Sequence, residues 1–123
     1  MPDTALVLEI LSQIYEATQK VLRRFEPINS ASDFTDSDAG MEKLDAICMQ
    51  LIAIGEGLKN LDKVTENTLL PQYPEIEWKK VKGMRDMISH HYFDLDAEAI
   101  FEVCKNHVGG LADTLRQMIN DLS

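Results

Sequence analysis

Residues 44–61, LDAICMQLIAIGEGLKNL, decide the fold class of this chain. Apolar residues recur in it every three or four positions, at Leu44, Ile47, Leu51, Ile54, Leu58 and Leu61. That spacing places them on one face of an α-helix of about five turns. Gly55 and Gly57 each lower helix propensity by about 1 kcal/mol relative to alanine. We therefore predict a long amphipathic helix in which the two glycines let another helix or backbone segment pack closely.

The same helical period occurs before this stretch. Residues 4–25 carry an apolar stripe that stops before Pro27 and consists of Val7, Leu11, Ile14, Val21 and Phe25, broadened by Leu8, Tyr15 and Leu22. Residues 27–38 are rich in side chains that compete with the backbone for hydrogen bonds, so they predict a loop. We expect that loop to end in a helix N-cap near Thr35 or Ser37.

Helical patterns also follow the central stretch. Residues 65–76 predict one short helical turn and a Pro71 to Pro74 connection, after which a helix resumes near Glu75 or Glu77. Asp94 or Asp96 is a suitable N-cap for a last helix. Its stripe keeps one phase through the two adjacent glycines, at Ala97, Phe101, Cys104, Val108, Leu111, Leu115, Met118 and Leu122. The unbroken phase predicts one helix, with Gly109 and Gly110 as the place for a kink.

These patterns predict an all-α protein. With no alternating strand pattern, we expect an up-and-down helical bundle of four main helices plus a short connecting helix. A chain of 123 residues that is 45% hydrophobic can bury a core as one domain, residues 1–123. Cys48 and Cys104 fall on apolar stripes, so we expect buried free thiols, which fits a reducing compartment.

Composition also limits the partners. The net charge of -9, from 21 acidic and 12 basic residues, argues against binding nucleic acid through the whole surface, so any RNA contact must be local. The N-terminal residues lack the basic region and cleavage site of a secretory signal. No stretch approaches the roughly 18 consecutive apolar residues of a membrane span. We expect a cytoplasmic protein with no membrane partner.

Residues 85–92, RDMISHHY, hold the most reactive side chains. On a continuous helix, Arg85 would share the buried stripe of Trp78, Val81, Ile88 and Tyr92, where a guanidinium needs a partner or a ligand. His90 lies about 140° from Arg85 on the helical wheel, so the two are poor partners within one straight helix. If they act together, either the helix ends before His90 or two copies of the motif meet across a dimer.

The chemistry of this set suits RNA cleavage. Histidine can deprotonate a ribose 2′-hydroxyl or protonate a leaving oxygen, and arginine can hold phosphate oxygens as charge develops. The sequence offers no metal-ligand spacing, phosphate loop or Ser-His-Asp set, so we expect no metal and no cofactor. The nearby Lys79, Lys80 and Lys82 fit a solvated face better than a phosphate site. His107 is expected to be a surface or capping residue, and Tyr92 is either core or exposed.

The motif Arg85-x-x-x-x-His90-x-Tyr92 resembles the HEPN superfamily, specifically the HepT-like toxins. Further blocks resemble the family in the same order, namely 54–61, 73–78, 83–85 and 92–96. The resemblance implies a homodimeric, metal-independent endoribonuclease in which the motifs of two subunits line one cleft. It also implies that Arg85 stabilises the phosphate, that His90 is the general acid or base, and that a cognate nucleotidyltransferase antitoxin adenylylates Tyr92.

One position departs from the family pattern. Asp86 stands where asparagine is usual, which puts a negative charge beside the proposed phosphate site and could orient a histidine, pair with Arg85 or weaken RNA binding. His91 is a second candidate for the histidine role. The alternative function is a non-catalytic helical partner of a nucleotidyltransferase that binds nucleotide or protein, and a plain dimeric scaffold is a third.

Overall fold

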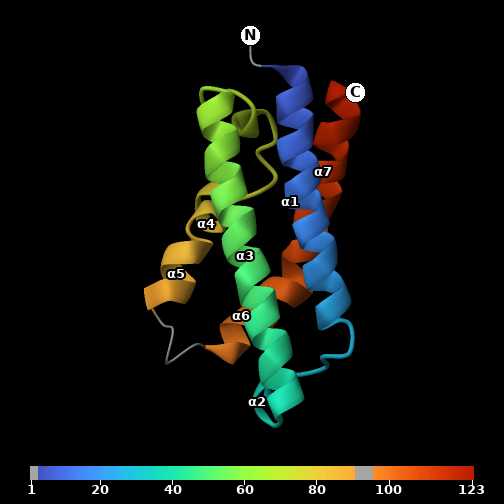
Figure 1. The fold of residues 1–123 in the computed structure, drawn as a ribbon, viewed down its shortest axis with the longest axis vertical. Coiled ribbons are helices and arrows are strands. Elements are labelled where there is room, and N and C mark those ends of the chain that lie inside the picture. Colours follow the sequence, from blue (N-terminus) through green and yellow to red (C-terminus); the bar gives the residue numbers. More distant parts are fainter. Residues whose placement is uncertain (1–2, 91–95) are drawn as a thin grey trace.

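The computed structural model describes residues 3–90 and 96–123, which form a helical bundle (Figure 1). Within these residues the chain has seven α-helices, one 3₁₀ turn and no strand. The elements are α1 Thr4–Phe25, α2 Ser32–Thr35, α3 Asp38–Val64, the 3₁₀ turn η1 Leu70–Gln72, α4 Trp78–Lys82, α5 Met84–His90, α6 Ala97–Asn106 and α7 Val108–Leu122. The predicted all-α class is confirmed. No helix in the described ranges combines the length and the apolar character needed to cross a bilayer.

Helices α1, α3 and α7 form the body of the bundle (Figure 1). Helix α1 packs along both α3 and α7, while α4 and α5 lie against the other side of α3. Leu11, Ile54 and Leu115, one from each long helix, are completely buried. Burial of such side chains contributes about 1.5–3 kcal/mol each, so the predicted apolar stripes do form the core.

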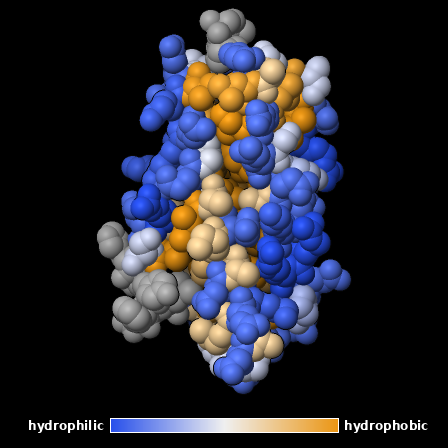
Figure 2. Space-filling view, viewed as in Figure 1, coloured by the Kyte–Doolittle hydropathy of each residue, from blue (hydrophilic) through white to orange (hydrophobic). Residues whose placement is uncertain are grey.

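Hydrophilic side chains cover most of the surface seen in Figure 2. Hydrophobic residues on that face gather at the end of the bundle where the two chain termini lie (Figures 1 and 2). The mainly polar surface agrees with the net charge of -9.

Acidic and hydroxyl side chains cap the starts of α1, α3 and α6. Asp3 accepts a hydrogen bond from the Ala5 amide at 3.0 Å, and Asp96 accepts one from the Glu98 amide at 3.0 Å. The Ser37 hydroxyl oxygen accepts one from the Gly40 amide, also at 3.0 Å. Each contact satisfies an amide that has no partner within its own helix. Of the predicted cap positions, Ser37 and Asp96 are the ones used.

The predicted loop 27–38 contains an additional short helix, α2. Its Phe34 is completely buried and its ring centroid lies 6.3 Å from that of Phe25. The Asp33 carboxylate accepts a hydrogen bond from the Asn29 amide at 2.7 Å, and this bond closes the turn that leads into α2. Phe34 is the one apolar residue within α2 and produces no periodic stripe, which is why the sequence pattern does not predict this helix.

The prediction of one last helix kinked at Gly109 and Gly110 is wrong. Helix α6 ends at Asn106 and α7 begins at Val108, with His107 between them at φ -126° and ψ -35°. Both glycines lie inside α7. The break occurs at an exposed residue and leaves the spacing of the buried side chains intact, so hydrophobic periodicity cannot detect it. His107 is exposed, as predicted.

Both thiols are buried and free, as predicted. Burial, the larger cause in each case, raises the pKa of Cys48 to about 11 and that of Cys104 to about 12. We expect native protein at pH 8 to resist iodoacetamide and unfolded protein to take up two labels, as measured by intact mass. Unfolded thiols ionise near pH 9, before the native ones do. The native state therefore loses stability as the pH rises above 9. Rapid labelling of either cysteine in the folded protein would contradict the burial of the two thiols.

Candidate functional site

Two glycines of α3 bring its neighbours close, as predicted. A Cβ atom added at Gly55 would lie 3.0 Å from the Val81 carbonyl oxygen of α4. One added at Gly57 would lie 2.7 Å from Cγ1 of Ile14 on α1. Because a hydrogen in place of a side chain permits these approaches, the segment that carries the arginine motif rests directly on the surface of α3.

The motif helix is divided in two at Gly83. Helix α4 ends at Lys82 and α5 begins at Met84. The Gly83 amide, which caps α4, donates to the carbonyl oxygens of Lys79 at 3.1 Å and Lys80 at 3.2 Å. The sequence pattern predicts one continuous helix here, and that prediction is wrong at Gly83.

The division changes which face of the motif is buried. Met84 and Ile88 are buried, whereas the side chain of Arg85 is 58% exposed. The prediction that Arg85 interrupts the buried stripe is therefore wrong. A wheel drawn across residues 78–92 assumes one unbroken helix, whereas the helix is interrupted at Gly83, and beyond it Met84 and Ile88 take the inward positions.

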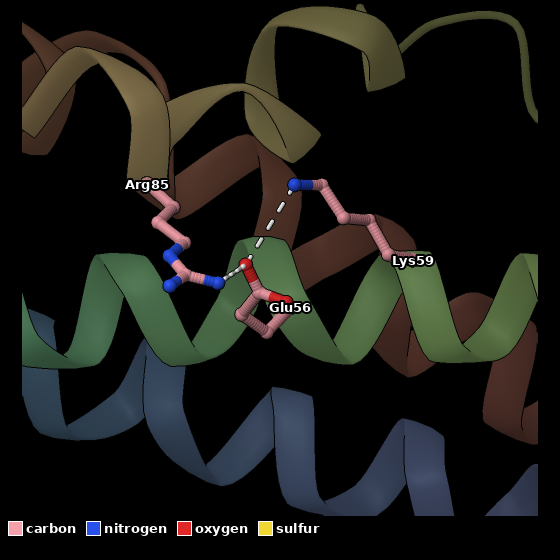
Figure 3. Close-up of polar contacts among 3 residues, drawn as sticks. All are labelled: Glu56, Lys59 and Arg85. Atoms are coloured by element: carbon pink, nitrogen blue, oxygen red, sulfur yellow. Dashed lines mark hydrogen bonds and ion pairs between the residues drawn. The ribbon is translucent and has the colours of Figure 1, made fainter. Parts of the chain in front are cut away.

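Arg85 contacts α3 through a carboxylate (Figure 3). Its Nη1 donates to Oε1 of Glu56 at 3.3 Å, and Nζ of Lys59 lies 3.6 Å from the same oxygen. All three side chains are at least 41% exposed. Two cations thus share one carboxylate, which leaves the cluster with a net positive charge on a protein that is acidic overall. Arg85 does have the expected partner, but the sequence did not indicate that it is Glu56.

The other residues predicted for the site have different positions. Asp86 is exposed on α5, and among the described residues the carboxylate that pairs with Arg85 belongs to Glu56. His90 is the last residue of α5, so it stands on the same helix as Arg85. His91 and Tyr92 lie outside the described residues. The structure thus brings Arg85 together with Glu56 and Lys59.

A groove of about 510 Å³ runs behind the motif helix, between α3, α4–α5 and α6–α7. Its apolar lining includes Ile54, Met84, Met87 and Leu111, and its polar lining includes His107. Arg85 is not among the lining residues. The guanidinium therefore faces open surface, an arrangement that suits an extended anionic substrate better than an enclosed small molecule.

Three basic residues of the motif region are held in ion pairs. Lys80 pairs with Glu77 at 2.9 Å on the exposed surface, which lowers the pKa of the Glu77 carboxyl. Lys82 pairs with Asp62 at 2.5 Å, and there both side chains are mostly buried. Together with the ion pair between Arg85 and Glu56, these contacts neutralise much of the local positive charge. The interpretation of this run as a solvated face rather than a phosphate site agrees with the exposed Lys79 and Lys80, whereas Lys82 lies mostly buried in its pair with Asp62.

The Asp62–Lys82 pair fastens α4 to α3, so its loss should destabilise the fold. We expect Asp62→Asn to lower the free energy of unfolding by about 1–2 kcal/mol, because a charged hydrogen bond at a mostly buried position is lost. Glu77→Gln, which removes the exposed pair with Lys80, is the matched control and should leave the urea midpoint unchanged. Equal midpoints for the two variants would contradict the assignment.

Among the side chains that the structure describes, no three His, Cys, Asp or Glu residues gather closely enough to hold a metal ion. The polar groups that the structure brings together beside the motif are instead one arginine, one lysine and one carboxylate. Such a set can bind and orient a phosphate but includes no histidine. A histidine must therefore complete any acid–base chemistry at this surface.

Known proteins resemble this chain over most of its length. The family described as "Ribonuclease HepT-like" matches residues 6–118. The protein named "Putative RNase MJ0127" from Methanocaldococcus jannaschii is 31% identical over 77 residues, which are 63% of this chain and 60% of that protein. "Probable ribonuclease HepT" from Thermococcus cleftensis is 32% identical over 66 residues, which are 54% of this chain and 56% of that protein.

The matched segments cover about 60% of the length of these relatives. No solved structure is significantly similar to the chain. The family match nevertheless extends from within α1 to within α7, so it includes most of the bundle and the entire motif. The chain belongs to the HepT-like ribonuclease family.

Proposed function

We propose that this protein is the toxin of a toxin–antitoxin pair, a metal-independent endoribonuclease that acts on RNA. The observation that supports this most directly is the match to a ribonuclease family over residues 6–118, which include the Arg-x-x-x-x-His-x-Tyr motif. The exposed guanidinium of Arg85 adds a group suited to a phosphate backbone. We propose one domain, residues 1–123, working in the cytoplasm.

Arg85 and His90 have separate chemical roles in this proposal. His90 takes the proton of the ribose 2′-hydroxyl or gives a proton to the leaving 5′-oxygen. The 2′-oxygen attacks phosphorus and the bond to the 5′-oxygen breaks, which leaves a cyclic phosphate and a free 5′-hydroxyl. Arg85 holds the non-bridging oxygens as their charge increases. Asp86 and His91 are supporting candidates beside them.

A homodimer supplies the geometry that one helix lacks. Arg85 and His90 are both on α5 and are five residues apart, about 140° around its axis. Positions that far apart on a helical wheel are poor partners within a single copy. In the proposed dimer, two copies of the motif line one cleft, so that an arginine and a histidine reach the same phosphate.

We further propose that a cognate nucleotidyltransferase antitoxin adenylylates the hydroxyl of Tyr92. The added adenylate is bulky and anionic, so it would exclude RNA from the cleft by volume and by charge. Coexpression with an adjacent nucleotidyltransferase should raise the intact mass of this protein by one or more adenylate groups. A Tyr92→Phe variant that gained the same mass would refute the assignment to this residue.

The decisive test of catalysis uses purified protein and RNA in the presence of EDTA. Cleavage that yields cyclic phosphate ends and persists in EDTA is the expected result. If the protein cleaves no RNA yet forms a stable complex with a nucleotidyltransferase, the alternative of a non-catalytic binding partner replaces the toxin. The exposed carboxylate of Asp86 beside Arg85 is the observation that favours this alternative.

A further inference from the structure

We infer that Glu56 is a positioning residue, which holds the guanidinium of Arg85 in the orientation that receives phosphate. The inference rests on the proposed role of Arg85 and assigns to α3 a part in the site. Glu56 is 29 positions from Arg85 in sequence and meets it through the 3.3 Å contact between Oε1 and Nη1.

The two sides of this contact differ in rigidity. Arg85 stands on α5, a helix of seven residues, and most of its side chain is in solvent. Glu56 stands more than two turns from either end of α3, a helix of 27 residues whose Ile54 and Leu58 are completely buried. A long exposed arginine side chain samples many rotamers, and a contact to a rigid element restricts them. Glu56 is thus the fixed point and Arg85 the group that it orients.

Adjacent residues of α3 make the contact possible. Gly55 allows the carbonyl end of α4 to approach, since a Cβ there would meet the Val81 oxygen at 3.0 Å. The chain then turns at Gly83 and presents Arg85 to the next residue of α3, Glu56. Gly55 therefore permits the close approach of α4, and the adjacent Glu56 makes the contact with Arg85. The position of Arg85 thus depends on the packing of α4 on α3.

The electrostatic arrangement keeps the site open to an anion. Lys59 approaches the same carboxylate oxygen at 3.6 Å, so the negative charge of Glu56 is divided between two cations (Figure 3). The three side chains carry a net charge of +1. The contact with Glu56 occupies Nη1, and the remaining N–H donors of the guanidinium are the ones that would meet phosphate oxygens.

The physical cost of losing this contact should appear in catalysis and not in stability. Exposed ion pairs contribute little to folding, and both side chains are well exposed. Misplacement of a catalytic group by about 1 Å can cost on the order of 100-fold in rate. We therefore expect Glu56→Ala to lower kcat by about 10- to 100-fold with an unchanged urea midpoint. Glu56→Gln keeps an acceptor oxygen and should retain most of the activity.

The experiment combines RNA cleavage with side-chain NMR of the full chain. The Nε–H signal of Arg85, assigned through its loss in Arg85→Lys, reports the order of the guanidinium by its heteronuclear NOE. We expect an ordered signal in the wild type and in Glu56→Gln, and a mobile signal in Glu56→Ala. Glu77→Ala is the matched control, because it removes another exposed glutamate with a lysine partner, and it should change neither kcat nor the signal.

The two readouts separate this inference from the proposed function. If the wild type cleaves no RNA, the proposed function fails, while the NMR comparison still decides whether Glu56 holds Arg85. If Arg85 is equally ordered in Glu56→Ala, the positioning role is refuted whatever the activity. If Glu56→Ala frees Arg85 but kcat stays at the wild-type value, Glu56 holds the side chain without any consequence for catalysis and the inference is overturned.

Discussion

Arg85→Ala is expected to lower RNA cleavage by about 10²- to 10³-fold, the loss that follows removal of a group that stabilises charge in a transition state. The fold should be unaffected, because the side chain is 58% exposed and its ion pair with Glu56 is at the surface. Arg85→Lys keeps the charge but loses the forked donor geometry, so it should recover only part of the rate. Initial rates on one RNA substrate in EDTA, with a urea melt of each variant, measure both effects.

His90→Ala should lower the rate of RNA cleavage by about 10²- to 10⁴-fold, since a general acid or base contributes in that range. His91→Ala is its matched control, as it removes a neighbouring imidazole from the same segment. A larger loss in His91→Ala than in His90→Ala would transfer the acid–base role to His91. Undiminished cleavage in both Arg85→Ala and His90→Ala would refute the proposed mechanism as a whole.

The long helices could be predicted from the sequence because their evidence is periodic and redundant. The stripe of α3 has six apolar members between Leu44 and Leu61, and all six are buried. Replacement of one of these apolar residues would not change the prediction. Burial of apolar surface is also the main force that holds the bundle together, so the pattern reports directly on the fold. The caps at Ser37 and Asp96 could be predicted for a local reason, since their side chains bond to amides two or three residues away.

The short helices and their breaks could not be predicted in the same way. The turns at Gly83 and His107 shift the backbone without disturbing the apolar spacing on either side, so they leave little trace in a periodic pattern. The error at Gly83 mattered most for function, because it placed Arg85 on the buried face when the side chain is exposed. A seven-residue helix offers about two turns, too few for its phase to be read independently of α4.

The candidate site was predicted in part. The sequence indicates that Arg85 needs a partner, but a wheel gives the direction of a side chain within one helix and not its neighbours on another. Glu56 lies 29 positions away. Its local pairing with Lys59, three residues on, was a visible signal. That pairing indicates a charged surface and says nothing of which helix lies against it.

Gly40→Ala should be among the most destabilising single changes in the bundle. A Cβ added at Gly40, in the first turn of α3, would lie 2.1 Å from the Asp33 carbonyl oxygen and 2.9 Å from that of Phe34. Both atoms are backbone, so relief requires movement of α2, which would pull the completely buried Phe34 ring from the core. Alanine gains about 1 kcal/mol of helix propensity over glycine, but overpacking of this kind costs about 1–3 kcal/mol and displacement of a buried phenylalanine more.

The overlap should therefore outweigh the gain in propensity, and we expect a net loss of about 2–3 kcal/mol in the free energy of unfolding, measured by urea denaturation. Gly110→Ala is the matched control, because a Cβ there meets nothing within 4 Å and the residue lies inside α7. It should gain up to about 1 kcal/mol from propensity alone. The two variants make the same chemical change with opposite expected signs, so a Gly40→Ala protein as stable as Gly110→Ala would show that α2 does not pack against α3 as closely as the structure has it.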